Sequence, residues 1–209
     1  IQEDNSTLPT ASELIYENKS YNKRKLSKEN KALVLKSYPL VFKTLSDLRF
    51  DIGYFIEGNI KVTESYDAPI SIACSNDIIA LHGKSLKIDI IDENRFSIVD
   101  ISNKNEQIRS FNEKFLFHGI ELVVKYNIDF PADNIDDLPV TVVKFRSLQS
   151  LTLTFQNSIV VKQKERESSV LNVSILSEDE SKGVVFLNKL IENYIAFDIN
   201  EKNLASHNT

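Results

Sequence analysis

The sequence contains few of the residues on which several common kinds of functional site depend. Its 209 residues include one cysteine, five glycines, no tryptophan and no methionine. The single cysteine, Cys74, excludes an intramolecular disulfide framework and a zinc site built from several thiolates. Phosphate-cradling loops need backbone conformations that are open mainly to glycine. We therefore expect no nucleotide chemistry and no cofactor.

Long apolar runs and an excess of positive charge are also missing. No stretch approaches the roughly 20 apolar residues that span a bilayer. The 25 Lys and Arg residues stand against 30 Asp and Glu residues, which gives a net charge of −5. A nucleic-acid-binding protein needs a basic surface, so we expect no nucleic-acid partner. The basic stretch around Lys23 to Lys25 lacks aromatic platforms and predicts a solvated arm.

The composition is otherwise that of a folded protein. Apolar residues make up 42% and charged residues 26% of the chain, which predicts one soluble domain. The chain begins at Ile1 without a charged-then-apolar leader, and its last apolar stripe still runs near Thr209. We therefore expect a fragment of a longer protein.

Hydrophobic spacing predicts a helical front. Apolar residues recur at intervals of three and four between Glu29 and Leu48. Pro39 would break a single helix, whereas Ser37 suits the N-cap of a second helix with Pro39 in its first turn. We predict two helices that meet near Lys36 and Ser37.

From Arg49 onward the apolar period falls to two, which predicts strands. Gly58-Asn59 is predicted to turn a hairpin between strands around Ile52 to Ile56 and Ile60 to Tyr66. The segment Ser147 to Gln156 fits either a strand, through its Leu and Thr alternation, or a short helix. Further strands are predicted at Ile70 to Cys74, Leu86 to Ile90, Phe96 to Ile101, Glu121 to Ile128, Val140 to Phe145, and as an antiparallel pair at Ser158 to Lys162 and Val170 to Leu176.

Helical spacing returns at Glu178. The acidic residues at 178–180 lie at the positive end of this helix dipole, and one apolar stripe is predicted at Val184, Leu187, Leu190, Ile191 and Tyr194. The order of elements predicts an α+β fold, a single domain with a mixed, mainly antiparallel sheet, helices packed on one face and a long C-terminal helix. Within the domain 1–209, we assign 1–27 to a polar arm with a short strand near 13–16, 28–177 to an α/β body, and 178–209 to the start of the long helix.

No local motif carries chemistry. His82, His118 and His207 are scattered and lack zinc-protease spacing. Cys74 lies in an apolar strand with no basic neighbour in sequence, so we interpret it as a small buried hydrophobe. The acidic loop Asp133, Asn134, Asp136 and Asp137 lacks the central glycine of a calcium loop, and Ile135 occupies a liganding position. We predict no catalytic, cofactor-binding or metal-binding residue.

Both ends of the sequence resemble one bacterial family. The segments Leu35-Lys-Ser-Tyr-Pro-Leu-Val41, Thr44-Leu-Ser-Asp-Leu-Arg-Phe50 and Gly53-Tyr54 resemble the opening of the periplasmic domain of polysaccharide co-polymerases, the chain-length determinants of capsule and O-antigen export, and most of all their Bacteroidetes members. Ala68-Pro69-Ile70, Ser168-Ser-Val-Leu171, Gly183 to Tyr194 and Lys202-Asn-Leu-Ala205 follow in the family's order. Ala68 replaces the usual serine before Pro69.

The resemblance implies a mechanical function without catalysis. Family members are anchored in the inner membrane by helices that lie outside this sequence. They assemble as rings beside the polysaccharide polymerase and regulate the length of the growing capsular or O-antigen polysaccharide. Larger members continue into a cytoplasmic tyrosine kinase. We therefore expect a periplasmic location, self-association as a membrane-anchored homo-oligomer, and contact with the polymerase and the growing polysaccharide.

Two other classes of function remain open from the sequence. A carbohydrate-binding or adhesion module of a secreted or surface-anchored protein would present exposed aromatic residues on one face, for which Tyr54, Phe55 and Tyr66 are the candidates. A hydrolase would need carboxylates that converge only in three dimensions.

Overall fold

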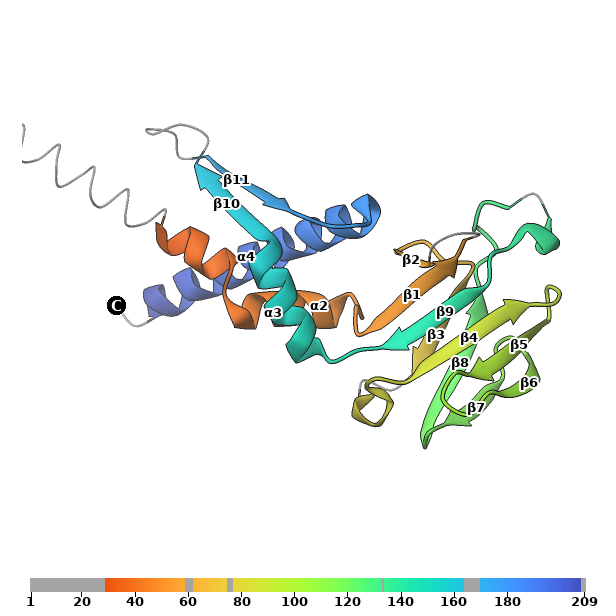
Figure 1. The fold of residues 1–209 in the computed structure, drawn as a ribbon. Helices are drawn as coiled ribbons and strands as arrows, with labels where there is room; N and C mark the ends of the chain where they lie inside the picture. The colour runs from red at the N-terminus through yellow and green to blue at the C-terminus, as the bar shows by residue number, and fades with distance from the viewer. Residues whose placement is uncertain (1–28, 59–61, 75–76, 133, 164–169, 208–209) are drawn as a thin grey trace, which may run out of the picture.

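The computed structural model describes residues 29–58, 62–74, 77–132, 134–163 and 170–207, with side chains described as far as residue 204. The predicted polar arm and its short strand near 13–16 lie outside these residues. The described part consists of a β-sandwich at one end and a helical unit at the other (Figure 1). Every strand pairing is antiparallel. The predicted α+β fold with a mainly antiparallel sheet and a long C-terminal helix is confirmed.

Two sheets form the sandwich. The larger has the strand order β2-β1-β9-β4-β5-β6 and the smaller the order β3-β8-β7. Alternate residues of both sheets point inward and form one core, with Phe96, Leu122 and Phe145 almost fully buried. The strands are β1 (Ile52–Glu57), β2 (Val62–Ser65), β3 (Ile70–Cys74), β4 (Ser85–Ile90), β5 (Arg95–Asp100), β6 (Asn105–Ser110), β7 (Lys114–Phe117), β8 (Ile120–Tyr126) and β9 (Thr141–Phe145). Two 3-10 turns, η1 (Ile79–Leu81) and η2 (Ile135–Asp137), lie between strands.

The helical unit has its own core. It comprises a helix over 29–35, α2 (Tyr38–Asp47), α3 (Leu148–Ser158), α4 (Glu180–His207) and the antiparallel pair β10 (Ile159–Gln163) and β11 (Leu171–Ile175). Val41, Leu45, Phe186 and Leu190 are buried at its centre. The prediction placed the helices on one face of the sheet. They line one face of the β10-β11 pair, whereas the six-stranded sheet is covered by the three-stranded sheet.

The predicted break between two front helices is confirmed. The first helix ends at residue 35, and Ser37 is the N-cap of α2 with extended backbone and a proline in the first turn. The Ser37 side chain makes no capping hydrogen bond, but its carbonyl accepts from Val41 N at 3.1 Å. Proline lacks an N–H group and therefore costs nothing at this position.

The ambiguous segment 147–156 is a helix. Ser147 caps α3 by accepting a hydrogen bond from Ser150 N. Thr152 and Thr154 donate their hydroxyls to the carbonyls four residues earlier, which satisfies these polar groups within the helix. A strand would place Leu151 and Leu153 on one face. The helix buries Leu151 in the core and leaves Leu153 58% exposed.

Two strands, β6 and β7, were not predicted. β6 has no apolar alternation, because its only large apolar residue, Ile108, points outward and is 64% exposed. β7 has only four residues. It joins β8 through His118 and Gly119, both with positive φ (45° and 84°), as in a type I′ hairpin turn.

The single apolar stripe predicted for the last helix is wrong. Leu187, Leu190 and Tyr194 face the core, and Phe186, which the prediction omitted, is fully buried there. Val184 and Ile191 instead lie on a second face and are 50% and 36% exposed. Helical spacing alone does not tell an apolar face that packs in the core from an apolar face that stays exposed on the same helix.

Candidate functional site

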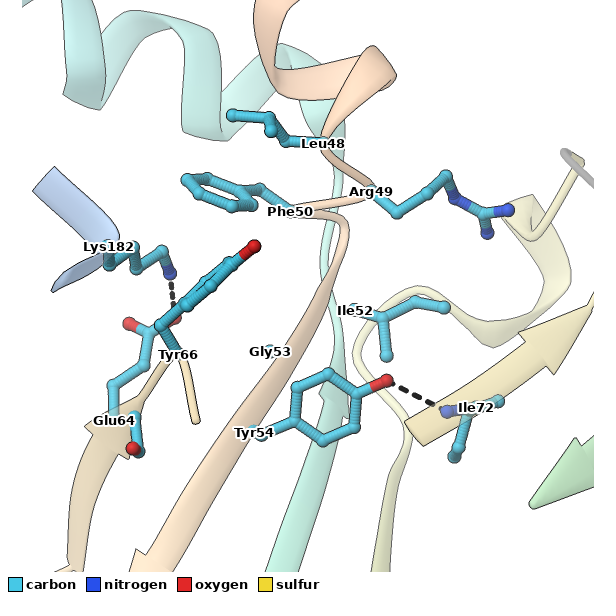
Figure 2. A pocket seen from close by; sticks show the side chains of 11 residues that line it. Leu48, Arg49, Phe50, Ile52, Gly53, Tyr54, Glu64, Tyr66, Ile72 and Lys182 are labelled. Atoms are coloured by element: carbon cyan, nitrogen blue, oxygen red, sulfur yellow. Dashed lines mark hydrogen bonds and ion pairs between the residues drawn. The ribbon is translucent and has the colours of Figure 1, made fainter. Parts of the chain in front are cut away.

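The sandwich and the helical unit are joined by a cluster of three charged side chains. Glu64 belongs to β2, Arg146 directly follows β9, and Lys182 lies in the first turn of α4. Arg146 donates from Nη2 to Glu64 Oε1 at 2.7 Å and from Nη1 to Oε2 at 3.2 Å. Lys182 Nζ donates to the same Oε1 atom (Figure 2). One carboxylate therefore holds two cations from distant parts of the chain.

The cluster is largely removed from water. The exposed fractions are 19% for the Glu64 side chain and 9% for that of Lys182. Burial acts to raise the pKa of Glu64, but the hydrogen bonds and charges of Arg146 and Lys182 outweigh it and hold this pKa below its ordinary value. For Lys182, burial and the neighbouring Arg146 guanidinium lower the pKa despite Glu64. The charged form of Glu64 is favoured because its carboxylate has two cationic partners. The charged form of Lys182 is disfavoured because it shares that one carboxylate with Arg146 and is buried.

Two further contacts join the start of α4 to the sandwich side of the junction, one to Tyr66 directly after β2 and one to Phe50 before β1. Asp179 caps the helix, since its Oδ1 accepts from Lys182 N at 2.9 Å, and its Oδ2 accepts from Tyr66 N at 2.6 Å. The Lys182 ammonium also lies 4.7 Å from the centre of the Phe50 ring, which favours a cation–π contact. Asp179, one of the acidic residues predicted at the helix start, therefore both caps α4 and binds it to the residue after β2.

Close packing around Arg146 requires a glycine in β1. Arg146 Nη2 donates to the Phe50 carbonyl at 3.0 Å, so the guanidinium lies against the β1 backbone. A Cβ atom at Gly53 would lie 2.7 Å from that Nη2 atom. The glycine of the Gly53-Tyr54 pair is therefore explained by the close approach of the Arg146 side chain to the β1 backbone.

A small cavity of about 120 Å³ adjoins the cluster, between the loop before β1 and the first turn of α4 (Figure 2). Leu48, Phe50, Tyr54 and Tyr66 are among the residues that line it. The Tyr54 hydroxyl points across it and accepts from Ile72 N at 2.9 Å. This volume lies well below the roughly 300–1,000 Å³ of pockets that bind drug-sized ligands. At its edge Glu64 pairs with both Arg146 and Lys182, and these ion pairs hold α4 against the sandwich.

Cys74 does have a basic neighbour, which the sequence did not reveal. Arg49, 25 residues earlier in the chain, donates from Nη2 to Cys74 Sγ at 3.3 Å and from Nε to Asp51 Oδ1 at 3.1 Å. Arg49 adopts positive φ (54°) at the corner between α2 and β1, which turns its side chain toward β3. The thiol is half-buried against this corner.

The scattered histidines and acidic loop do not converge in the described residues. His82 follows η1, whereas His118 Nε2 lies 3.1 Å from Asp100 Oδ2 and contributes no group to a site with His82. In the acidic loop, Asn134 donates to Asp137 Oδ2 at 3.1 Å. Asp133 and the His207 side chain lie outside the described residues. No group of three His, Cys, Asp or Glu residues in the described part could hold a metal ion.

The three aromatic candidates for a sugar platform do not share one exposed face. Tyr54 and Phe55 are neighbours in β1 and therefore point to opposite sides of the sheet. Tyr54 is half-buried against the sandwich core, and its hydroxyl accepts a hydrogen bond from Ile72 N. Lys144 Nζ covers the Phe55 ring at 4.1 Å, and Tyr66 packs edge-on against Phe50.

One face of α4 carries exposed apolar side chains that have no described partner. Val184, Ile191, Ile195 and Ile199 recur at spacings of seven, four and four, which places them on one side of the helix. Their exposed fractions are 50%, 36%, 51% and 54%. We call these four residues the outer stripe of α4. It lies away from Phe186 and Leu190, which face the core.

A scan against models of known protein families finds no match to the chain, and a search of the curated proteins finds no match. Among the described residues, no helix is long and apolar enough to cross a membrane.

Proposed function

We propose that this chain is a non-catalytic periplasmic domain of an inner-membrane polysaccharide co-polymerase. In this role it regulates the chain length and export of a capsular or O-antigen polysaccharide by assembling with further copies of itself in a ring. The partners are other copies, the polysaccharide polymerase and the growing polysaccharide, and the membrane helices lie outside this sequence.

Two of the segments that carry the family resemblance, one in α2 and one in α4, pack together, which supports this proposal. Asn193, from the C-terminal segment, donates from Nδ2 to Thr44 Oγ1 at 3.2 Å and to Asp47 Oδ2 at 3.0 Å, both in the N-terminal segment. Asn193 and Thr44 are 7% and 0% exposed. Buried polar groups need their partners, so these bonds fix α4 against α2 in one register. α2 and α4 therefore form one packed base.

The outer stripe of α4 is the observation that carries the proposal. Four large apolar residues at helical spacing remain exposed on a helix whose opposite face is already buried. A helix with a second apolar face is typical of one that packs against a further helix. We assign that partner to the neighbouring copy in the ring, where membrane anchoring raises the local concentration and closure of the ring adds weak contacts together. The isolated chain is accordingly expected to be monomeric or weakly associating.

The test uses two matched double variants of the full-length protein in its own bacterium. Ile195→Lys with Ile199→Lys places two charges in the outer stripe. Ala196→Lys with Asn200→Lys places the same two charges at exposed positions about 100° further around the helix. Cross-linking of intact cells reports oligomers, and electrophoresis of the extracted polysaccharide reports its length distribution.

The stripe variant is expected to lose cross-linked oligomers and to change the polysaccharide length distribution, whereas the control variant keeps both. Unaltered polysaccharide after deletion of the whole gene would refute the assignment to polysaccharide export. Normal oligomers in the stripe variant would refute the role of α4. A stable high-order ring formed by residues 1–209 alone would contradict the expectation of weak association.

A further inference from the structure

The edge strand β6 turns polar side chains toward the inside of the sandwich. Its pairing with β5 sets Arg109 opposite Phe96 and Gln107 opposite Ile98. Residues directly opposite in an antiparallel pair lie on the same face of the sheet. Phe96 and Ile98 belong to the core, so Gln107 and Arg109 continue the core-facing side at the sheet edge. The one large apolar residue of β6, Ile108, faces outward. This is the reverse of an ordinary half-buried strand.

The reversed strand lines an open groove. A cavity of about 290 Å³ lies between β6, at the edge of the larger sheet, and β7, at the edge of the smaller one. Asp100, Asn105, Gln107 and Arg109 line it from the larger sheet. Phe115 and Phe117 belong to β7 and are only 8% exposed, so they form an apolar floor below the polar side chains.

The polar groups of the groove are held in place before any ligand arrives. Asp100 Oδ1 accepts from Ser102 N at 2.9 Å and from its hydroxyl at 2.5 Å, and Asp100 Oδ2 lies 3.1 Å from His118 Nε2. Arg109 donates from Nη2 to Gln107 Oε1 at 2.6 Å, and its guanidinium carbon lies 4.8 Å from the centre of the Phe115 ring. Side chains fixed in this way lose little entropy when a ligand binds.

The chemistry of the groove selects among classes of ligand. An apolar ligand would remove water from a carboxylate, two amides and a guanidinium without offering their remaining donors and acceptors a hydrogen bond. A phosphate would face the Asp100 carboxylate with a single arginine to offset it. A neutral ring with several hydroxyls suits the site better, because amides both donate and accept while the carboxylate accepts. The faces of the buried phenylalanines suit the apolar side of such a ring.

We propose that this groove binds one hexopyranose unit, with Asp100, Asn105, Gln107 and Arg109 hydrogen-bonded to its hydroxyls and Phe115 beneath the ring. The cavity volume is close to the lower end of the range that ligand pockets span and fits one sugar ring. The strands that line the groove, β6 and β7, belong to the sandwich, whereas α4 belongs to the helical unit (Figure 1). Sugar binding can therefore be tested separately from self-association.

The experiment titrates isotope-labelled protein of residues 1–209 with defined sugars and follows the backbone amide resonances. The probes are glucose, galactose, mannose, N-acetylglucosamine and glucuronate, each as the free sugar and as its methyl glycoside. We expect at least one probe to shift the resonances of β5, β6 and β7 saturably. Equal binding of the methyl glycoside assigns the site to a unit within a chain, and loss of binding assigns it to a free reducing sugar.

Two variants of neighbouring residues in β6 make a matched pair. Gln107→Ala removes an amide from the groove and is expected to weaken binding about tenfold, the effect of losing one or two hydrogen bonds. Ile108→Gln adds an amide to the opposite face of the same strand and is expected to leave binding unchanged. Both positions are exposed, so far-UV circular dichroism should show intact folds. The proposal is overturned if no probe shifts these resonances, or if Gln107→Ala binds as tightly as the unaltered protein.

Discussion

Removal of the Glu64 carboxylate charge should destabilise the junction between the two halves of the molecule. Glu64→Gln keeps the shape of the side chain but leaves the Arg146 and Lys182 charges without their shared carboxylate. Loss of one partner from a fully buried ion pair costs about 3–5 kcal/mol. The side chains of Glu64 and Arg146 are 19% and 23% exposed, and Arg146 keeps its bond to the Phe50 carbonyl. We therefore expect Glu64→Gln to lower the free energy of unfolding by about 2–3 kcal/mol.

Equilibrium unfolding in urea, followed by far-UV circular dichroism because the chain has no tryptophan, measures this change. A second variant, Lys182→Met in the Glu64→Gln background, removes the stranded ammonium. The free energy of unfolding of the double variant should exceed that of Glu64→Gln alone by about 1 kcal/mol or more. Lys202→Met breaks an exposed pair with Asp198 and serves as the control, with no measurable change expected. If Glu64→Gln behaves like this control, or if the two substitutions simply add, the reasoning about a shared buried carboxylate is refuted.

Three further predictions concern the contact between α2 and α4 and the cluster around Glu64. Asn193→Ala should lower the free energy of unfolding by about 1–3 kcal/mol through loss of its buried hydrogen bonds, whereas the exposed Asn188→Ala should not; equal effects in urea unfolding would contradict this. Gly53→Ala should cost about 1–2 kcal/mol by displacing Arg146, and less in the Glu64→Gln background; an equal cost in both backgrounds would argue against displacement. Because the pKa of Glu64 is lowered in the folded state, its contribution is present above its ordinary value of 4.5 and is lost as pH falls through the lowered value, so the acid dependence of stability should be shallower in Glu64→Gln.

Local sequence patterns predicted most of the helices and strands because each of these elements depends mainly on residues that are close together in the sequence. The proline at position 39 and the preceding Ser37 locate the break between the first two helices. Period-two alternation locates β1, β3, β4, β5, β8 and β9, since each has one face in a buried core and needs apolar residues on that face. The same logic fails for β6, where the core-facing residues Gln107 and Arg109 line an open groove.

Pairings between distant residues could not be predicted in this way. Glu64 lies 82 residues from Arg146 and 118 residues from Lys182, and no motif links the three. The contact between Arg49 and Cys74 depends on positive φ at Arg49, a conformation that the sequence does not mark with glycine. No local pattern identifies these contacts.

The sequence by itself determined the α+β class, the antiparallel character of its hairpins and the place of the long C-terminal helix, because hydrophobic periodicity and capping act over a few residues. Only the tertiary structure decided which faces of α4 are buried and which stay exposed. Ile191 and Leu190 are adjacent in sequence, yet one is exposed and the other is in the core. An apolar side chain favours burial wherever it lies in the sequence. The packing geometry of the folded molecule determines which apolar side chains are buried.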